Sequence, residues 1–278
     1  MSINKKVLVL DGYNLMFRAR YSTKFRTETS TIFNFFRSLR SLHEEFSPDL
    51  TYLVLEGKPV KRLEATKKLF GEVTYKAQRT YEDTDNFSNQ RKVITDMLIN
   101  YFPVKVVRHA SFECDDICNY IANNLHENDD SIIVSSDTDF IQSINENCKL
   151  YNPVKKAFIS KPDFDYVTYK SLKGDKSDNI DGFKGIGEKT AIRLCNDKEK
   201  LEKLLSTEEN LVKFNHNKFM IQFHDIEEID LEGINYLNEG KTFNSEEVFK
   251  KFTELDFKSI INKENYWNSF KNTFAREE

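Results

Sequence analysis

Nine acidic residues fall at the ends of predicted strands or in the loops and helix starts that follow them. These residues are Asp11, Glu56, Glu113, Asp115, Asp116, Asp137, Asp139, Asp175 and Asp178. Carboxylates gathered within ~4–6 Å of one another raise each other's pKa values, so a cluster of this kind needs counterions. An all-oxygen ligand set suits Mg²⁺ or Mn²⁺ better than zinc. Two such ions about 3.5–4 Å apart would activate water and stabilise a phosphodiester under attack.

Each pair of acids also has a simpler interpretation. Glu113 and Asp116 open a predicted helix, where they could act as caps. Asp137 and Asp139 flank a threonine, as in an ordinary turn. The acids of LKGDKSDN could be solvated loop residues. The joint occurrence of these groups at strand and loop ends favours a shared site.

A glycine-rich segment, GFKGIGEKTAIRL (182–194), follows the last two acids. Glycines let a backbone approach a phosphate closely, and a helix N-terminus then receives the anion. A dinucleotide-binding fingerprint requires a preceding strand, whereas the residues before this segment are predicted to be helical and then polar. We therefore predict helix–hairpin–helix binding to a DNA backbone, with a plain helix–helix turn as the alternative. The predicted contacts are Gly182, Lys184, Gly185, Gly187, Lys189 and Thr190.

The basic residues are concentrated near the N-terminus. Residues 1–80 hold 15 lysines and arginines against 8 acids, whereas the remainder holds 26 against 37. Within residues 58–81, lysines and arginines alternate with Tyr75 and Tyr81 and apolar periodicity is weak, which predicts a mobile segment or a poorly packed helix. A basic part facing an acidic part suggests an enzyme that grips a polyanion and holds cations against it. Solvated helix faces are the alternative.

Strands and helices alternate over the first 160 residues. Strands are predicted at 5–11, 51–55, 104–107 and 131–134, with a strand or hairpin at 149–151 and 157–159. Helices are predicted at 14–20, 27–46, 85–101, 114–125 and 140–144. This alternation predicts an α/β fold with a mostly parallel central sheet flanked by helices. Ligands bind at the carboxyl ends of such strands, where the acids lie.

Strands are expected to stop near residue 160, after which helices continue. The candidates are 165–172, 189–195, 198–205, 208–214 and 246–252. We therefore expect an α/β core at 1–160 that includes the basic segment at about 58–90. A helical region at 161–278 would contain the hairpin element at about 170–196.

Composition excludes several classes of protein. No run approaches the ~18 uncharged apolar residues of a membrane span, and the N-terminus lacks a secretory signal. Four scattered cysteines do not form a disulfide scaffold, and scarce glycine and proline exclude collagen-like and disordered chains. A cytoplasmic, thiol-containing protein is expected. The sequence carries no signal of oligomeric state, so a monomer is the default expectation.

An ordered set of motifs over residues 6–195 resembles the 5′-nuclease, or flap endonuclease, family. The motifs are LVLDGYNLMFR, YKAQR, ECDD, SSDTDF and KGDKSDNIDGFKGIGEKTA. The similarity is greatest to stand-alone phage 5′-exonucleases and to the N-terminal nuclease domain of bacterial DNA polymerase I. It implies a PIN-like fold with a helical arch, and a metal-dependent phosphodiesterase acting at 5′ flaps, nicks or 5′ ends of DNA.

The resemblance also implies residue roles. Asp11, Glu113, Asp115, Asp116 and Asp137 would serve a first metal site, and Asp139, Asp175 and Asp178 a second. Lys76 and Arg79 match basic residues that steady the scissile phosphate, Tyr75 an aromatic stacking position, and Arg18 the arginine of the first motif. The hairpin would hold a K⁺ ion. Glu56 stands where the family usually has an aspartate.

We expect the enzyme to act in phage or bacterial DNA replication, including the removal of RNA primers, where replication proteins are candidate partners. An RNase acting on RNA–DNA hybrids would share every motif. A small-molecule phosphatase would use Asp137 and Asp139 as a nucleophile pair. A third alternative, a non-catalytic protein that binds DNA junctions, is possible only if the protein binds no metal.

Overall fold

The computed structural model describes residues 4–24, 27–78, 85–240 and 242–275. A seven-stranded sheet runs in the order β6-β5-β4-β1-β2-β3-β9. Its strands are β1 (Lys6–Asp11), β2 (Leu50–Leu55), β3 (Lys105–His109), β4 (Asp130–Val134), β5 (Cys148–Asn152), β6 (Ala157–Ile159) and β9 (Ile234–Tyr236). Strands β1 to β5 pair in parallel, and the two edge strands are antiparallel. The predicted mostly parallel α/β sheet is confirmed.

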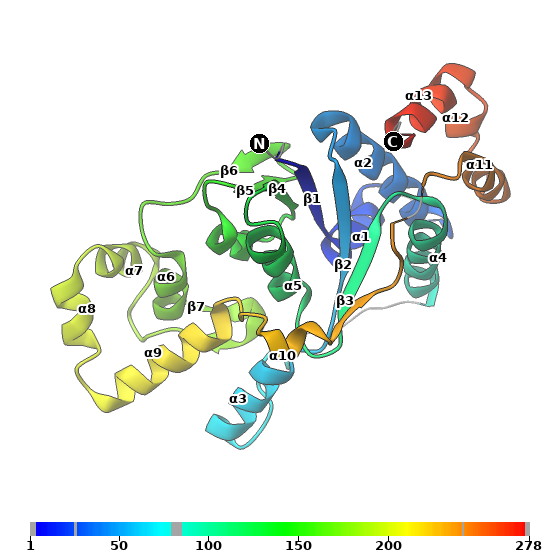
Figure 1. Ribbon diagram of the computed structural model, residues 1–278. Helices are drawn as coiled ribbons and strands as arrows, with labels where there is room; N and C mark the ends of the chain where they lie inside the picture. The colour runs from blue at the N-terminus through cyan, green and yellow to red at the C-terminus, as the bar shows by residue number, and fades with distance from the viewer. Residues whose placement is uncertain (1–3, 25–26, 79–84, 241, 276–278) are drawn as a thin grey trace.

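Strand β1 is central and buried on both faces, which explains its unbroken apolar sequence VLVL. Because successive side chains point to opposite faces, Leu8 and Leu10 belong to one hydrophobic core and Val7 and Val9 to another. Helices α1 (Gly12–Tyr21), α2 (Ser30–Phe46) and α4 (Asp85–Tyr101) cover the first face. Helix α5 (Cys114–Tyr120) and the π-helix Ile121–Leu125 cover the second (Figure 1).

The C-terminal helices extend the first of these layers. Helices α11 (Ser245–Glu254), α12 (Lys258–Ile261) and α13 (Glu264–Phe274) contribute buried aromatic side chains beside α2 and α4. Phe36 of α2 stacks on Phe102 at 4.9 Å, and Phe102 meets Phe274 edge-on at 5.1 Å. The many phenylalanines of the sequence therefore serve this aromatic core.

The expectation that strands stop near residue 160 is wrong. Strand β9 adds to the sheet edge beside β3, and β7 (Gly174–Asp175) pairs with β8 (Ile180–Asp181) in a separate small sheet. These strands are only two or three residues long, too short for an alternating apolar pattern. Residues 234–240 and 242–274 thus return to the core, whereas the boundary near 160 stays a prediction.

Between β6 and β9 lies a helical lobe with its own small core. It contains α6 (Tyr166–Lys173), α7 (Glu188–Cys195), α8 (Lys198–Leu204), α9 (Glu208–Ile221) and α10 (Glu228–Leu231). Leu172, Phe183 and Phe214 are buried together there. Figure 1 shows α6 to α9 on the opposite side of the sheet from α11 to α13.

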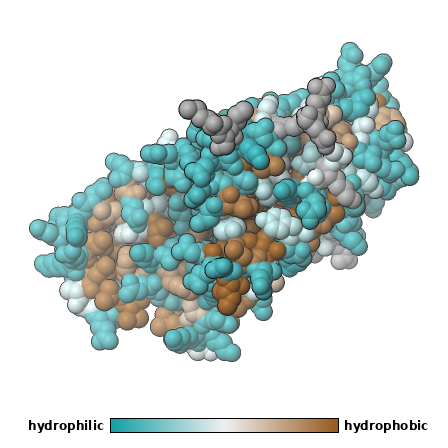
Figure 2. All heavy atoms as spheres, viewed as in Figure 1, coloured by the Kyte–Doolittle hydropathy of each residue, from teal (hydrophilic) through white to brown (hydrophobic). Residues whose placement is uncertain are grey.

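Several boundaries shift from those predicted. Helix α2 starts at Ser30 and not Thr27, α9 continues to Ile221, and residues 138–143 form a 3-10 helix. Helix α3 (Val60–Phe70) buries only Arg62 and Thr66, which confirms a poorly packed helix in the basic segment. None of the helices within the described residues is long and apolar enough to cross a membrane. On the face shown in Figure 2, hydrophobic surface forms patches among hydrophilic residues.

Candidate active site

The carboxyl ends of the strands open into a cavity of about 1140 Å³ that gathers seven of the nine predicted acids. These are Asp11, Glu56, Asp115, Asp137, Asp139, Asp175 and Asp178. They come from the end of β1, the loops after β2 and β4, the first turn of α5, and the segment around β7. Parallel pairing of β1 with β2 and β4 places three of these segments at one edge.

Asp11 is held in place by hydrogen bonds at both of its carboxylate oxygens. It is the N-cap of α1, accepting a hydrogen bond from the Asn14 backbone at 3.1 Å, and Ser135 Oγ donates to its other oxygen at 2.8 Å. Burial raises the pKa of Asp11 to about 6 despite these bonds, with a smaller contribution from Asp137. Its carboxylate is therefore held in place but short of positive charge.

The neighbouring acids show the same deficit of cations. Burial raises the pKa of Asp115 well above its usual value, and the carboxylates of Asp11, Asp137 and Glu56 raise it further. Burial, together with Glu113, raises the pKa of Glu56 to about 7. A divalent cation among these groups would remove the conflict.

On the other side of the cavity, a lysine joins two carboxylates. Lys170 of α6 donates from Nζ to Asp139 Oδ1 and to Asp175 Oδ2, each at 2.5 Å. Burial alone would raise the pKa of Asp175, but Lys170 and Ser177 hold it at about 2. Burial raises the pKa of Asp139 to about 6, although Lys170 opposes this.

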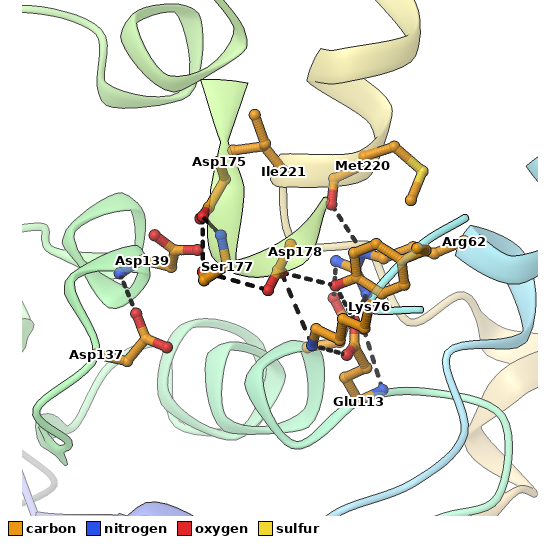
Figure 3. A network of polar contacts seen from close by, with 12 residues as sticks. Arg62, Lys76, Glu113, Asp137, Asp139, Asp175, Ser177, Asp178, Met220 and Ile221 are labelled. Atoms are coloured by element: carbon orange, nitrogen blue, oxygen red, sulfur yellow. Dashed lines mark hydrogen bonds and ion pairs between the residues drawn. The ribbon is translucent and has the colours of Figure 1, made fainter. Parts of the chain in front are cut away.

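A second lysine makes a matching bridge. Lys76 pairs with Glu113 and lies 3.8 Å from Asp178, so it links α5 to the segment after β7. Burial alone would lower the pKa of Lys76, but these carboxylates raise it above its usual value. Tyr75, 5% exposed, donates to Glu113 at 3.0 Å and to Asp178 at 3.2 Å. Figure 3 shows Lys76, Glu113 and Asp178 directed toward one another beside Arg62.

Glu113 and Asp116 are not among the described residues that line the cavity. Asp116 is fully buried, and both of its oxygens accept hydrogen bonds from Arg62, at 2.7 and 2.9 Å. Arg62 Nη1 also donates to Glu113 at 2.7 Å. The two acids form a capping box at the start of α5, which confirms the helix-cap interpretation. Positions three apart share a helix face, so both turn away from the face of Asp115.

The predicted cations are placed unevenly. Lys76 lines the cavity, whereas Arg18 is partly buried on α1 and is not among the described lining residues. Arg79 lies outside the described residues. Sequence reasoning missed Lys170, Lys173, Lys176 and Arg91, which do line the cavity. Lys176 adjoins Asp175 in the sequence, whereas only the packing of α6 and α4 brings Lys170, Lys173 and Arg91 to the acids.

The glycine segment borders the same cavity. Gly187, the N-cap of α7, and Ile186 are lining residues, and Lys184 and Lys189 are exposed nearby in sequence. Gly185 has a φ of 79°, the left-handed region that glycine enters readily. A Cβ on Gly182 would meet the Lys173 carbonyl oxygen at 2.0 Å, so this glycine permits close packing of the lobe. Thr190 is partly buried on α7.

The donor set fits divalent metals. Seven carboxylates supply only oxygen ligands, and four of them have raised pKa values that a cation would lower. Within the described ranges, however, no three acidic, cysteine or histidine side chains are drawn together tightly enough to hold an ion. The ammonium of Lys170 pairs with Asp139 and Asp175, and that of Lys76 with Glu113 and Asp178. The raised pKa values of Asp11, Glu56 and Asp115 mark the part of the cavity that lacks positive charge.

Two sequence profiles match the chain. The 5′-3′ exonuclease N-terminal resolvase-like domain matches residues 6–171, and the 5′-3′ exonuclease C-terminal SAM fold matches residues 161–229. The first match covers more than half of the chain. The second coincides with the helical lobe that carries the glycine segment.

Curated relatives agree with these profiles. The chain is 27% identical to a 5′-3′ exonuclease of Aquifex aeolicus (strain VF5), across 91% of this chain and 83% of the relative. It is 30% identical to the thermostable DNA polymerase I of Thermus thermophilus, across 72% of this chain but only 25% of that longer protein.

Solved structures share the fold. A bacteriophage T5 flap endonuclease complex with DNA and metal ions superposes with a TM-score of 0.61 at 21% identity, over 78% of this chain and 89% of that one. Human GEN1 in complex with Holliday junction DNA gives 0.53 at 18% identity, over 91% and 68%. At these identities the likeness establishes the fold alone.

Proposed function

The chain belongs to the 5′-3′ exonuclease family and is a phosphodiester-cleaving nuclease, and on that premise we propose that it is a divalent-metal-dependent 5′-nuclease of branched and nicked DNA. Its proposed substrates are 5′ flaps, nicks and 5′ ends of duplex DNA. The observation that supports this most is the single cavity in which seven carboxylates meet basic side chains. The T5 relative whose fold it shares was captured with DNA and metal ions.

We propose Mg²⁺ as the cofactor, with Mn²⁺ as a substitute. Asp11, Glu56, Asp115 and Asp137 would hold one ion, and Asp139, Asp175 and Asp178 a second. When bound, the metal supplies an activated water and positive charge at the phosphodiester.

The protein's own groups do the remaining work. Lys76 places an ammonium at the cavity wall, where it can stabilise the negative charge that builds on the phosphate. Lys170 lies opposite and can exchange its carboxylate partners for a phosphate oxygen. Asp11 is held in one orientation by Ser135 and Asn14, which keeps its oxygens directed for ligation.

We propose that duplex DNA lies along the glycine segment. The exposed Lys184 and Lys189 and the open backbone at Gly185 and Gly187 are accessible to a phosphate. A K⁺ ion at this hairpin is part of the same proposal. Arg79 would contact the scissile phosphate. Tyr75 is 5% exposed and directs its hydroxyl to two carboxylates, so its proposed role is to hold Glu113 and Asp178 in place and not to stack on a base. Selectivity would rest on DNA shape and not on base identity.

We also propose that the enzyme removes RNA primers from the 5′ ends of RNA–DNA hybrids and that replication proteins are its partners. We propose that it acts as a monomer in the cytoplasm. A phosphatase mechanism is disfavoured by the family and by the geometry. Asp137 Oδ1 accepts the Asp139 backbone N–H at 2.9 Å, and Asp139 is neutralised by Lys170. A carboxylate so engaged is a poor nucleophile.

The test uses DNA labelled at its 5′ end as flapped, nicked and blunt substrates, with Mg²⁺ or with EDTA. Wild-type protein should cut near the flap junction only when Mg²⁺ is present. An Asp139→Asn, Asp178→Asn double variant should lose at least about 10²-fold in rate, the scale seen when one stabilising group of a hydrolytic site is removed. The matched control is Asp130→Asn, an exposed acid at the opposite end of β4. Cleavage by the double variant at the wild-type rate would refute the proposal.

A further inference from the structure

Two short segments far apart in sequence lie side by side next to the carboxylate cavity. Residues 74–78, after α3, and residues 176–179, after β7, are joined by hydrogen bonds, and we call this contact the seam. The Lys76 backbone N–H donates to the Asp178 carbonyl at 3.1 Å. Asn179 Nδ2 donates to the Thr74 carbonyl at 2.9 Å, and Gln78 Nε2 donates to the Lys176 carbonyl at 2.7 Å. The seam therefore ties the basic segment to the acids around β7.

Both segments contain a residue in the left-handed region of backbone space. Lys76 has a φ of 55° and Asn179 a φ of 60°. Asparagine enters this region readily, whereas a lysine does so only when neighbouring contacts hold it there. Seam hydrogen bonds reach Lys76 itself and the residues two positions before and after it. Strain of this kind is found where structure serves function.

The conformation of Lys76 decides where its ammonium lies. With its backbone left-handed, Lys76 directs Nζ between Glu113 and Asp178 and lines the cavity. An extended backbone at this position would turn Cβ, and with it the whole side chain, in another direction. The seam thus aims the ammonium, and Asn179 supplies the side-chain bond on the N-terminal side of Lys76, as Gln78 does on the C-terminal side.

We propose that Asn179 is a positioning residue for the nuclease reaction, acting through Lys76. Asn179 is not among the described residues that line the carboxylate cavity. It lines a separate cavity of about 710 Å³ between α3 and α9, together with Thr74 and Tyr75. Its amide is exposed, so its loss changes little buried surface. The inference rests on the role proposed above for Lys76.

Asparagine meets both requirements of the position. It tolerates the left-handed backbone, and its Nδ2 donates to the Thr74 carbonyl. Glycine would keep the backbone and lose the bond. Aspartate would keep the shape but set a carboxylate oxygen against a carbonyl oxygen. Both variants should free the 74–78 segment, and aspartate should do so more strongly.

The experiment measures single-turnover cleavage of a 5′-flapped duplex in Mg²⁺ by full-length protein. Asn179→Gly should lower the maximal rate by about three- to tenfold, the range for one exposed hydrogen bond, and Asn179→Asp by more. The DNA concentration at half-maximal rate should stay within about twofold, because the effect is on Lys76 and not on DNA affinity. The thermal unfolding midpoint should match that of wild type.

Asn210→Asp is the matched control, because Asn210 Nδ2 also donates to one backbone carbonyl, that of Leu204, at 2.8 Å, but lies away from the seam. It should cleave at the wild-type rate. Asn179→Gly is then added to Lys76→Met, and the double variant should be no slower than Lys76→Met alone.

The outcomes separate the two claims. Full activity of Lys76→Met would remove the proposed role of Lys76 and, with it, the role of Asn179. A slow Lys76→Met with an unaffected Asn179→Gly would overturn only the seam. The proposed role of Asn179 would also be overturned if Asn179→Gly slowed cleavage by the same factor in Lys76→Met as in wild type. Asn179 would then act independently of Lys76.

Discussion

Lys170→Met removes the ammonium that joins the two acidic segments on the lobe side of the cavity. Lys170 Nζ lies 2.5 Å from both Asp139 and Asp175, and all three side chains are less than 20% exposed. Methionine keeps most of the apolar stem and deletes only the charge. In metal-free protein, the two carboxylates would then face each other without a counterion.

The cost follows from the two bonds that are lost. A hydrogen bond between charged groups contributes about 1.5–3 kcal/mol, and breaking a buried ion pair costs about 3–5 kcal/mol. The residual solvent access of all three side chains lowers this to about 2–4 kcal/mol. For a chain of this size, the loss corresponds to a midpoint decrease of roughly 4–8 °C.

The assay is thermal unfolding at pH 8 in EDTA and again with Mg²⁺ or Mn²⁺. Lys170→Met should be the less stable protein in EDTA, and the metal should stabilise it more than it stabilises wild type, because no ammonium competes for the carboxylates. Lys176→Met is the matched control, an exposed lysine of the same cavity, and should behave as wild type. Equal midpoints for Lys170→Met and wild type in EDTA would refute the reasoning.

Three further predictions concern the same region. The carboxyls of Asp11, Glu56 and Asp139 have pKa values of about 6–7 in the folded protein, above the ~4 expected in an unfolded chain. The folded protein therefore binds more protons than the unfolded chain, and the free energy of unfolding without metal should fall as pH rises from about 4 to 7. Saturating Mg²⁺ should abolish that fall, and a flat or rising profile in EDTA, measured by urea unfolding, would contradict the sign. Arg62→Met should lower the free energy of unfolding in urea by about 3–5 kcal/mol, because Asp116 would keep a buried charge without its partner. Lys61→Met is the control and should cost under about 1 kcal/mol, because Lys61 is more exposed. Gly182→Ala should lower the unfolding midpoint, because its Cβ would clash with a carbonyl, whereas Gly187→Ala has open space and should not; equal midpoints would count against the close packing.

The strand-end acids could be predicted from sequence because one rule places them. Asp11 ends the buried apolar strand β1, and Asp137 lies three residues after the end of the buried apolar strand β4. Parallel neighbours in a sheet bring such ends to one edge, whatever the loops between them do. The same rule led to Glu56 after β2. The positions of these residues could be predicted because a buried strand and its end can be recognised from an apolar run in the sequence.

The orientation of Asp116 could not be predicted from the order of the strands. It adjoins Asp115, but one residue turns an α-helix by about 100°, so the two carboxylates point to different faces. Glu113 and Asp116 share a face and meet Arg62, whose partner could not be identified from α3 alone. Lys170 was missed for a related reason, since only the folded lobe sets α6 beside the loop after β4. Strand β9 was missed because three residues at a sheet edge leave no pattern.

The central claim is that acids from separate strands form one site for divalent cations. Anomalous diffraction from crystals grown with Mn²⁺ tests it most directly, because manganese scatters where Mg²⁺ would bind. We expect Mn²⁺ peaks inside the cavity, one contacting Asp11 or Asp115 and one contacting Asp139 or Asp175, with the Lys170 ammonium displaced from its carboxylates. Ordered Mn²⁺ found only outside the cavity, with Lys170 still bridging both acids, would contradict the account.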